Sequence, residues 1–115
     1  MSLDHLLPLP PPVFNILIAL AEGDRHGYAI MQEVAERTGG KVRLGPGSLY
    51  GSIKRMLEQG LIEEVRARAA ATSEDERRRY YRLTRLGRRA AQAEAARLDE
   101  ILGRARAHGL LPERG

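Results

Sequence analysis

A glycine-rich stretch followed by a helical pattern holds the residues whose types and spacing could do chemistry. The stretch LGPGSLYGSIKRMLEQGLIE occupies residues 44–63, and its polar side carries hydroxyl groups and two cations. Small residues at a helix start let the backbone approach a phosphate, and the amino end of a helix favours an anion. Cations one turn further on reach base edges in a DNA groove. We expect a DNA-contacting face made of Ser48, Tyr50, Gly51, Lys54 and Arg55, with a solvated, capped helix face as the alternative.

Two other kinds of chemistry fit the sequence poorly. The letters GPGSLYG approximate the dinucleotide pattern G-x-G-x-x-G, but the third glycine comes one residue late and no continuously apolar strand precedes it. His5, His26 and His108 are far apart without metal-ligand spacing, and the absence of Cys excludes thiolate ligands. We therefore expect no enzyme activity, no cofactor and no metal site. His26 is expected to be a local hydrogen-bonding group at a helix start.

The composition indicates one small domain with a mild positive charge and an excess of Arg over Lys. The chain has 115 residues and a net charge of +4, and only two of its 19 basic residues are Lys. Arg makes bidentate contacts with phosphates and bases, although a coding bias explains the same excess. The longest apolar run, Val13–Ala21, is interrupted by Asn15 and is too short to cross a bilayer, and the N-terminal residues lack the pattern of a signal peptide. We expect a cytoplasmic protein.

The order of the helix and strand patterns predicts the fold class. The expected elements, in chain order, are helices over 12–23, 24–40 and 45–60, strands over 61–68 and 77–84, and a helix over 85–109. Asp24, Gly45 and Thr84 are the expected N-caps, and residues 41–44 are too few for more than a stub strand. Three helices followed by a two-stranded wing describe a mainly α winged helix-turn-helix with a small β-hairpin. In that fold the third helix enters the DNA major groove.

The expected wing carries its own basic run beside an acidic loop. Three arginines stand where the loop returns into the second strand, and we expect them to hold the DNA backbone or enter the minor groove: Arg77, Arg78 and Arg79. Arg66 and Arg68 stand on the first strand. The carboxylates of residues 74–76 would repel phosphate, or neutralise the arginines when DNA is absent. A salt-laced surface hairpin is the alternative.

The last helix is longer than a compact three-helix core can cover. The 24 residues from Arg85 to His108 extend about 36 Å at 1.5 Å per residue, and one side is an alanine-rich apolar stripe. A partner should cover such a stripe, and we expect a second copy of the chain. The expected dimer contacts are Phe14, Leu17, Leu98, Ile101, Leu102 and Ala105. The alternative is that the stripe folds back on its own domain.

These patterns divide the chain into four segments. They are a proline-rich lead-in (1–12), a winged helix-turn-helix domain (13–83), a dimerisation helix (84–109) and a tail (110–115). The helix order and the basic face together predict binding to palindromic duplex DNA as a dimer. A winged helix used for protein–protein contact, without DNA readout, is the alternative function.

Three linked motifs resemble the PadR-like family of bacterial transcriptional regulators. They are DRHGYAIMQEV (24–34), GPGSLYGSIKRMLEQGLIEE (45–64) and RRRYYRLTRLGRRA (77–90), and the likeness covers about residues 13–96. The residues on the family's motif positions are His26, Gly27, Tyr28, Leu49, Tyr50, Gly60, Leu61, Ile62, Tyr81, Thr84 and Gly87. The chain departs from the pattern at Gly45, where the family more usually has a Ser before the proline, and this bears on one phosphate contact.

The resemblance implies a winged-helix repressor of the short branch, which dimerises through a single C-terminal helix. It also implies that Tyr50 is the family tyrosine at the DNA face and that the other motif positions are structural. Some relatives sense small molecules, often aromatic ones, at the dimer interface. This chain has no Trp, which disfavours an aromatic-lined effector pocket and leaves any effector unidentified.

Overall fold

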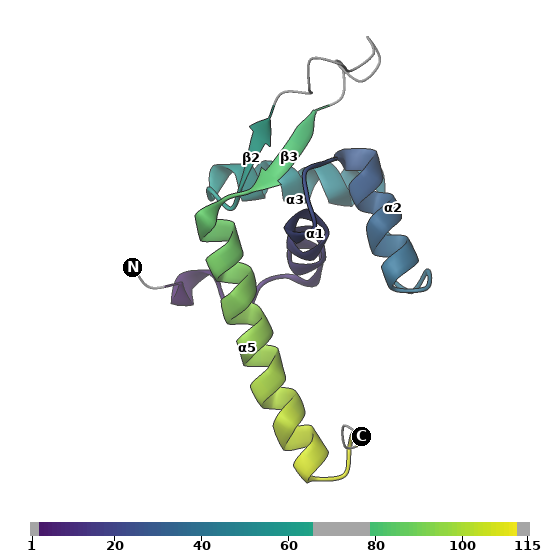
Figure 1. The fold of residues 1–115 in the computed structure, drawn as a ribbon, viewed down its shortest axis with the longest axis vertical. Helices are drawn as coiled ribbons and strands as arrows, with labels where there is room; N and C mark the ends of the chain where they lie inside the picture. Colours follow the sequence, from purple (N-terminus) through teal and green to yellow (C-terminus); the bar gives the residue numbers. More distant parts are fainter. Residues whose placement is uncertain (1–2, 66–78, 113–115) are drawn as a thin grey trace.

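A three-helix core, a small antiparallel sheet and a long projecting helix make up the fold (Figure 1). The computed structural model describes residues 3–65 and 79–112. Its elements, in chain order, are a 3-10 helix η1 (Asp4–Leu6), α1 (Pro11–Ala21), β1 (Arg25–His26), α2 (Gly27–Arg37), α3 (Pro46–Glu58), β2 (Ile62–Val65), β3 (Tyr80–Leu83) and α5 (Arg85–Ala107). The predicted fold class, a mainly α winged helix-turn-helix with a small hairpin, is confirmed.

Helix α1 lies at the centre of the core because it is apolar on nearly every side. Two prolines occupy its first turn, where a missing N–H costs no helical hydrogen bond. Its buried residues are Val13, Ile16, Leu17, Ala19 and Leu20, and it contacts α2, α3, α5 and β3. The helix starts and ends within two residues of the predicted bounds. Within the described part of the chain, no helix has both the length and the apolar character that a membrane span requires.

The turn into α2 differs from the prediction. Asp24 does not cap α2, because the helix begins only at Gly27; its carboxylate pairs instead with Arg82 on β3, at 2.9 Å between Oδ2 and Nη2. The N-cap is His26, whose Nδ1 accepts a hydrogen bond from the Ala29 N–H at 3.1 Å. This confirms the prediction that His26 bonds locally at a helix start. Residues 41–44 form no strand, and the short strand β1 lies earlier in the chain than any predicted strand.

Strand β3 is the central strand of a three-stranded antiparallel sheet in the order β1-β3-β2. Ile62 pairs with Leu83 and Val65 with Tyr80, so the inner part of the predicted hairpin is confirmed. On its other edge β3 pairs with β1, which ties the wing to the start of α2. The outer parts of both predicted strands and the acidic loop between them fall in residues 66–78, outside the described residues.

A close backbone crossing fixes the start of α5 against the end of α3. Thr84 caps α5 as predicted: its Oγ1 accepts from the Gly87 N–H at 3.0 Å and donates to the Gly60 carbonyl oxygen at 2.6 Å. A Cβ on Gly87 would overlap the carbonyl oxygen of Leu61, so glycine is required for this approach. Gly60 follows α3 as predicted, and its φ of +77° lies in the left-handed region that favours glycine.

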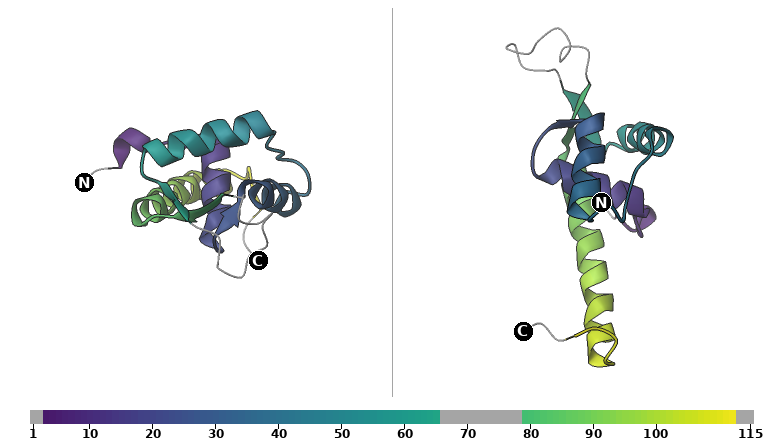
Figure 2. Two further views of the ribbon diagram at one scale, coloured as in Figure 1. Left: turned by 90° about the horizontal axis from the view of Figure 1, so that it is seen from above. Right: turned by 90° about the vertical axis from the view of Figure 1, so that its right-hand side faces the viewer.

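Only the first half of α5 packs into the core. Gly87, Ala90 and Glu94 are its buried residues, and the rest of the helix projects away from α3 and the sheet (Figures 1 and 2). The Glu94 carboxylate accepts hydrogen bonds from Arg97 at 2.8 and 2.9 Å and from the Leu9 N–H at 3.3 Å. It therefore anchors the proline-rich lead-in to α5.

Candidate nucleic-acid interface

The exposed side of α3 brings together five of the predicted DNA-contacting residues. Gly45 is the N-cap, and its carbonyl oxygen accepts from the Leu49 N–H at 2.8 Å, while Pro46 fills the first turn. Leu49, Ile53 and Met56 are buried and anchor the opposite side of the helix. The exposed residues on the outer side are Gly47, Ser48, Tyr50, Gly51, Lys54, Arg55 and Glu58. The helix thus offers hydroxyl groups, two cations and, at its last residue, one carboxylate on a surface of small residues.

The cations of α3 differ from the arginines of the scaffold in their partners. Four scaffold arginines each hold a carboxylate within 2.9 Å: Arg25 with Glu22, Arg37 with Glu33, Arg82 with Asp24, and Arg97 with Glu94. Lys54 and Arg55 are exposed, and neither has a carboxylate partner within residues 3–65 and 79–112. Their charges are available to an anionic partner.

Tyr50 lies where α3 meets the start of α2. The residue is 49% exposed, yet its hydroxyl oxygen would be only 2.5 Å from a Cβ added at Gly27. The phenol therefore rests against the first residue of α2. The next residue, Tyr28, is 57% exposed. The family motif at residues 24–34 and the family motif at residues 45–64 thus meet in space, which neither motif could indicate alone.

The wing contributes one of its three predicted arginines to the described structure. Arg79, just before β3, is exposed and lies 3.7 Å from the Glu64 carboxylate on β2, measured from its Nε. Arg77 and Arg78 lie outside the described residues, as do Arg66 and Arg68. Burial raises the pKa of Tyr81 on β3, with a smaller contribution in the same direction from Glu64 and an opposing one from Arg79.

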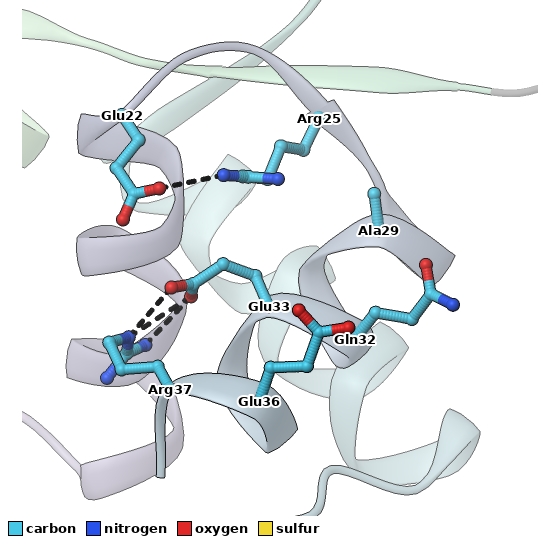
Figure 3. A pocket seen from close by; sticks show the side chains of 7 residues that line it. All are labelled: Glu22, Arg25, Ala29, Gln32, Glu33, Glu36 and Arg37. Carbon is cyan, nitrogen blue, oxygen red and sulfur yellow. Dashed lines mark hydrogen bonds and ion pairs between the residues drawn. The ribbon is translucent and has the colours of Figure 1, made fainter. Parts of the chain in front are cut away.

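A polar hollow of about 460 Å³ between α1 and α2 is lined by charged side chains (Figure 3). Arg25 donates to Glu22 and to a carbonyl oxygen at the end of α1, and Arg37 pairs with Glu33. Arg37 also donates to the carbonyl and side-chain oxygens of Asn15 on α1, at 3.1 and 3.0 Å. These arginines hold α2 against α1. Within the described ranges, no three His, Cys, Asp or Glu side chains are grouped as metal ligands.

The predicted dimer contacts on α5 lie on its projecting half. Ile101 and Leu102 are 49% and 41% exposed, and Leu98 and Ala105 are partly buried. Leu110, which is not among the predicted dimer contacts, is 76% exposed just beyond α5. An apolar Leu110–Leu111 pair after the helix-ending glycine was the signal for it.

The predicted dimer contacts on α1 differ from each other. Phe14 is only partly buried and packs at the margin of the core. Leu17 is fully buried inside its own chain, with an exposed fraction of 0%. Its assignment to the dimer surface is corrected, because its side chain has no surface to offer a partner. In a helix that is apolar all round, the sequence alone cannot separate an inner position from an outer one.

Three helices, a wing and an exposed basic side on the third helix define a winged helix-turn-helix protein. The model of the family described as "Transcriptional regulator PadR-like family" matches residues 16–93. The chain belongs to this family of transcriptional regulators, as its motifs predicted.

Solved structures share the fold along most of the chain. A PadR family transcription regulator from Clostridium difficile is 25% identical, with a TM-score of 0.74 over 86% of this chain and 98% of that one. RosR from H. salinarum is 29% identical, with a TM-score of 0.60 over 86% of this chain and 79% of that one. PadR from Bacillus subtilis, solved in complex with operator DNA, is 21% identical, with a TM-score of 0.62 over 75% and 47%.

Two curated relatives match in sequence. An uncharacterised 37.1 kDa protein of transposon TN4556 from Streptomyces fradiae is 37% identical over 89 residues, which are 77% of this chain and 23% of that protein. Protein X of Lysinibacillus sphaericus, also uncharacterised, is 36% identical over 73 residues, 64% of each chain. The chain thus spans less than two thirds of the length of either relative.

Proposed function

We propose that the chain is a transcriptional repressor that binds a palindromic DNA operator as a homodimer. The observation that carries the proposal is the outer side of α3, where Lys54 and Arg55 are exposed with no carboxylate partner in the described part of the chain. Cations left unpaired beside a helix start built of small residues suit a polyanion that approaches closely. The Bacillus subtilis PadR structure, in complex with operator DNA, supports this choice of partner through its shared fold.

The side chains of α3 and the wing contact different parts of the DNA, some the phosphates and others the base edges. Ser48 and Tyr50, near the amino end of α3, donate hydrogen bonds to phosphates and set the register of the helix on the duplex. Lys54 and Arg55, one turn further along, reach base edges in the major groove. Arg77, Arg78 and Arg79 hold the backbone beside it. Phosphate contacts supply affinity, and the two groove-facing cations supply sequence preference.

The homodimer is proposed from the apolar surface at the far end of the molecule. Ile101, Leu102 and Leu110 are large, exposed and apolar. The first two lie on the part of α5 that projects from the core, and Leu110 lies just beyond the end of that helix. A second copy that covers them, with Leu98, Ala105 and Phe14 at the margins, would place two α3 helices on one DNA duplex. Two recognition helices of a dimer sit about 34 Å apart, one turn of B-DNA, so the operator should be an inverted repeat.

Selection followed by footprinting tests this function. The purified chain is incubated with duplex fragments of the host genome at physiological salt, and the bound fragments are sequenced and footprinted. We expect an inverted repeat with two protected half-sites about 34 Å apart, and a scrambled duplex of equal composition should compete poorly. A reporter gene placed behind the selected operator should lose expression when the chain is present. Binding that ignores base sequence would refute the proposal, and a reporter that gains expression would refute repression.

A further inference from the structure

The contact between Gly27 and Tyr50 joins the two helices of the helix-turn-helix at the proposed DNA surface. We propose that Gly27 is a positioning residue for DNA binding: its missing side chain lets the Tyr50 phenol rest against the start of α2, which fixes where the hydroxyl meets the operator. The inference rests on the proposed function, because it takes Tyr50 to be a DNA contact. The family resemblance implies only a structural role for Gly27, and positioning of a DNA-contacting side chain is a further role.

Space is what requires glycine at position 27. A Cβ there would lie 2.5 Å from the Tyr50 hydroxyl oxygen, 3.0 Å from Cζ and 3.1 Å from Cε1. These three nearest atoms all belong to Tyr50. The backbone is helical at Gly27 and its φ is not positive, so conformational freedom is not the reason for glycine here. Any side chain would push the phenol off α2.

The start of α2 is a firm surface for the phenol to rest against. His26, directly before Gly27, caps the helix through its Nδ1. Its ring packs edge-on against the Tyr80 ring, with 5.3 Å between the two ring centroids. His26 also belongs to β1, which pairs with β3. Gly27, which touches Tyr50, is therefore held in place through its neighbour His26, by the cap of α2 and by the pairing of β1 with β3. A backbone position held in this way limits where the Tyr50 phenol can lie.

An added Cβ should have different effects at Gly87, where it should disturb the fold, and at Gly27, where it should displace only one side chain. At Gly87 an added Cβ meets a backbone carbonyl oxygen, which cannot move without opening the junction of α3 and α5. At Gly27 it meets the far end of a half-exposed side chain, which can swing outward. An alanine at position 27 should therefore leave the fold intact and displace the hydroxyl of Tyr50. The loss should appear in DNA binding rather than in stability.

A double-mutant cycle on operator affinity tests the inference. The variants are Gly27→Ala, Tyr50→Ala and the double variant, with Gly103→Ala as the matched control. Gly103 is helical, has nothing within 4 Å of an added Cβ, and lies on the side of α5 opposite the apolar stripe on 100° steps. Affinity is measured for the duplex recovered by the selection above. Circular dichroism follows the fold, and NMR of ring-labelled tyrosine, assigned with Tyr50→Ala, follows the phenol.

If Gly27 positions the Tyr50 phenol, the four variants should differ in operator affinity. Gly27→Ala and Tyr50→Ala each weaken operator binding by about tenfold, the cost of one lost hydrogen bond to a charged group. The double variant binds within about twofold of Tyr50→Ala, because contacting side chains are not additive and the colliding atoms are then gone. Gly103→Ala binds like the parent. Gly27→Ala keeps the parent's helix content and shifts the Tyr50 ring signals.

Three results would overturn the inference on its own, with the proposed function intact. They are a Gly27→Ala variant that binds like the parent, losses that multiply in the double variant, and Tyr50 ring signals that Gly27→Ala leaves unchanged. A parent chain that prefers no duplex refutes the proposed function itself, and the role of Gly27 in DNA binding with it. The parent measurement therefore separates the two failures.

Discussion

Replacing Glu94 by Gln should lower the free energy of unfolding, because a buried carboxylate here serves three donors at once. The residue is 3% exposed and accepts two hydrogen bonds from Arg97 and one from the Leu9 N–H. Gln offers one acceptor oxygen, so at least one of these donors loses its partner, and its NH₂ group, in a side-chain position that is only 4% exposed, is turned toward donors and has no acceptor. An unsatisfied buried polar group costs about 1–3 kcal/mol, which is the expected loss at pH 7.

The pH dependence of this loss has a definite sign. The hydrogen bond from Arg97 is the main cause that holds the pKa of Glu94 below its ordinary value; burial acts in the opposite direction, and the Leu9 N–H adds to the lowering. A carboxyl whose pKa is lower in the folded state stabilises the fold above its unfolded pKa, and this contribution disappears as the pH falls through the folded value. The parent should therefore lose stability below about pH 4.3. The Gln variant should lack this part of the loss.

Urea unfolding followed by circular dichroism measures both effects. Parent and variant are compared at pH 7, 5 and 3 at one protein concentration, since the stability of a dimer depends on concentration. Glu100→Gln, an exposed position on the same helix, is the matched control and should behave like the parent. The reasoning is refuted if Glu94→Gln is as stable as the parent at pH 7, or if the difference between them stays the same at pH 3.

Three further predictions concern the α3–α5 junction, the DNA contacts and the dimer. Gly87→Ala should lower the free energy of unfolding by about 3 kcal/mol, because the new Cβ overlaps a backbone carbonyl; an unchanged thermal midpoint would contradict this. Arg55→Ala should cost about 1–3 kcal/mol of operator affinity and relax one base preference, whereas Arg79→Ala should weaken all sequences alike and reduce the salt slope by about one. Electrophoretic shifts over a salt series decide between them, and exchanged outcomes would reverse the assignment. Leu98→Asp/Leu102→Asp should sediment as a folded monomer with weak operator binding, because two half-sites are no longer engaged together; a dimer that binds normally would rule out this interface.

The sequence predicted the elements that are defined by regularly spaced apolar residues and by residues that cap or end a helix. Apolar spacing on α3 separated its buried side from its exposed side, and Thr84 and Gly60 marked the ends of neighbouring elements. These signals are local, since a helix repeats every 3.6 residues and a cap acts within one turn. The exposed side of α3 was therefore predictable residue by residue.

Contacts between distant parts of the chain were not predictable in this way. Asp24 had the right residue type for a cap but pairs with Arg82, 58 positions away. The contact between the Tyr50 phenol and Gly27 and the burial of the Leu17 side chain likewise depend on how three helices pack. A strand of two residues, such as β1, is too short for alternation to appear. Packing geometry, rather than local preference, decides each of these positions.

The measurement that tests the central claim most directly is the specificity ratio of the outer side of α3. The dissociation constants for the selected operator and for a scrambled duplex are measured at physiological salt, for the parent and for Lys54→Ala/Arg55→Ala. If these two cations read bases, the parent should prefer its operator by about 10³-fold or more, and the double variant should lose most of this preference while it keeps weak binding to any duplex. A parent ratio near one, or a double variant that discriminates as well as the parent, would contradict the account.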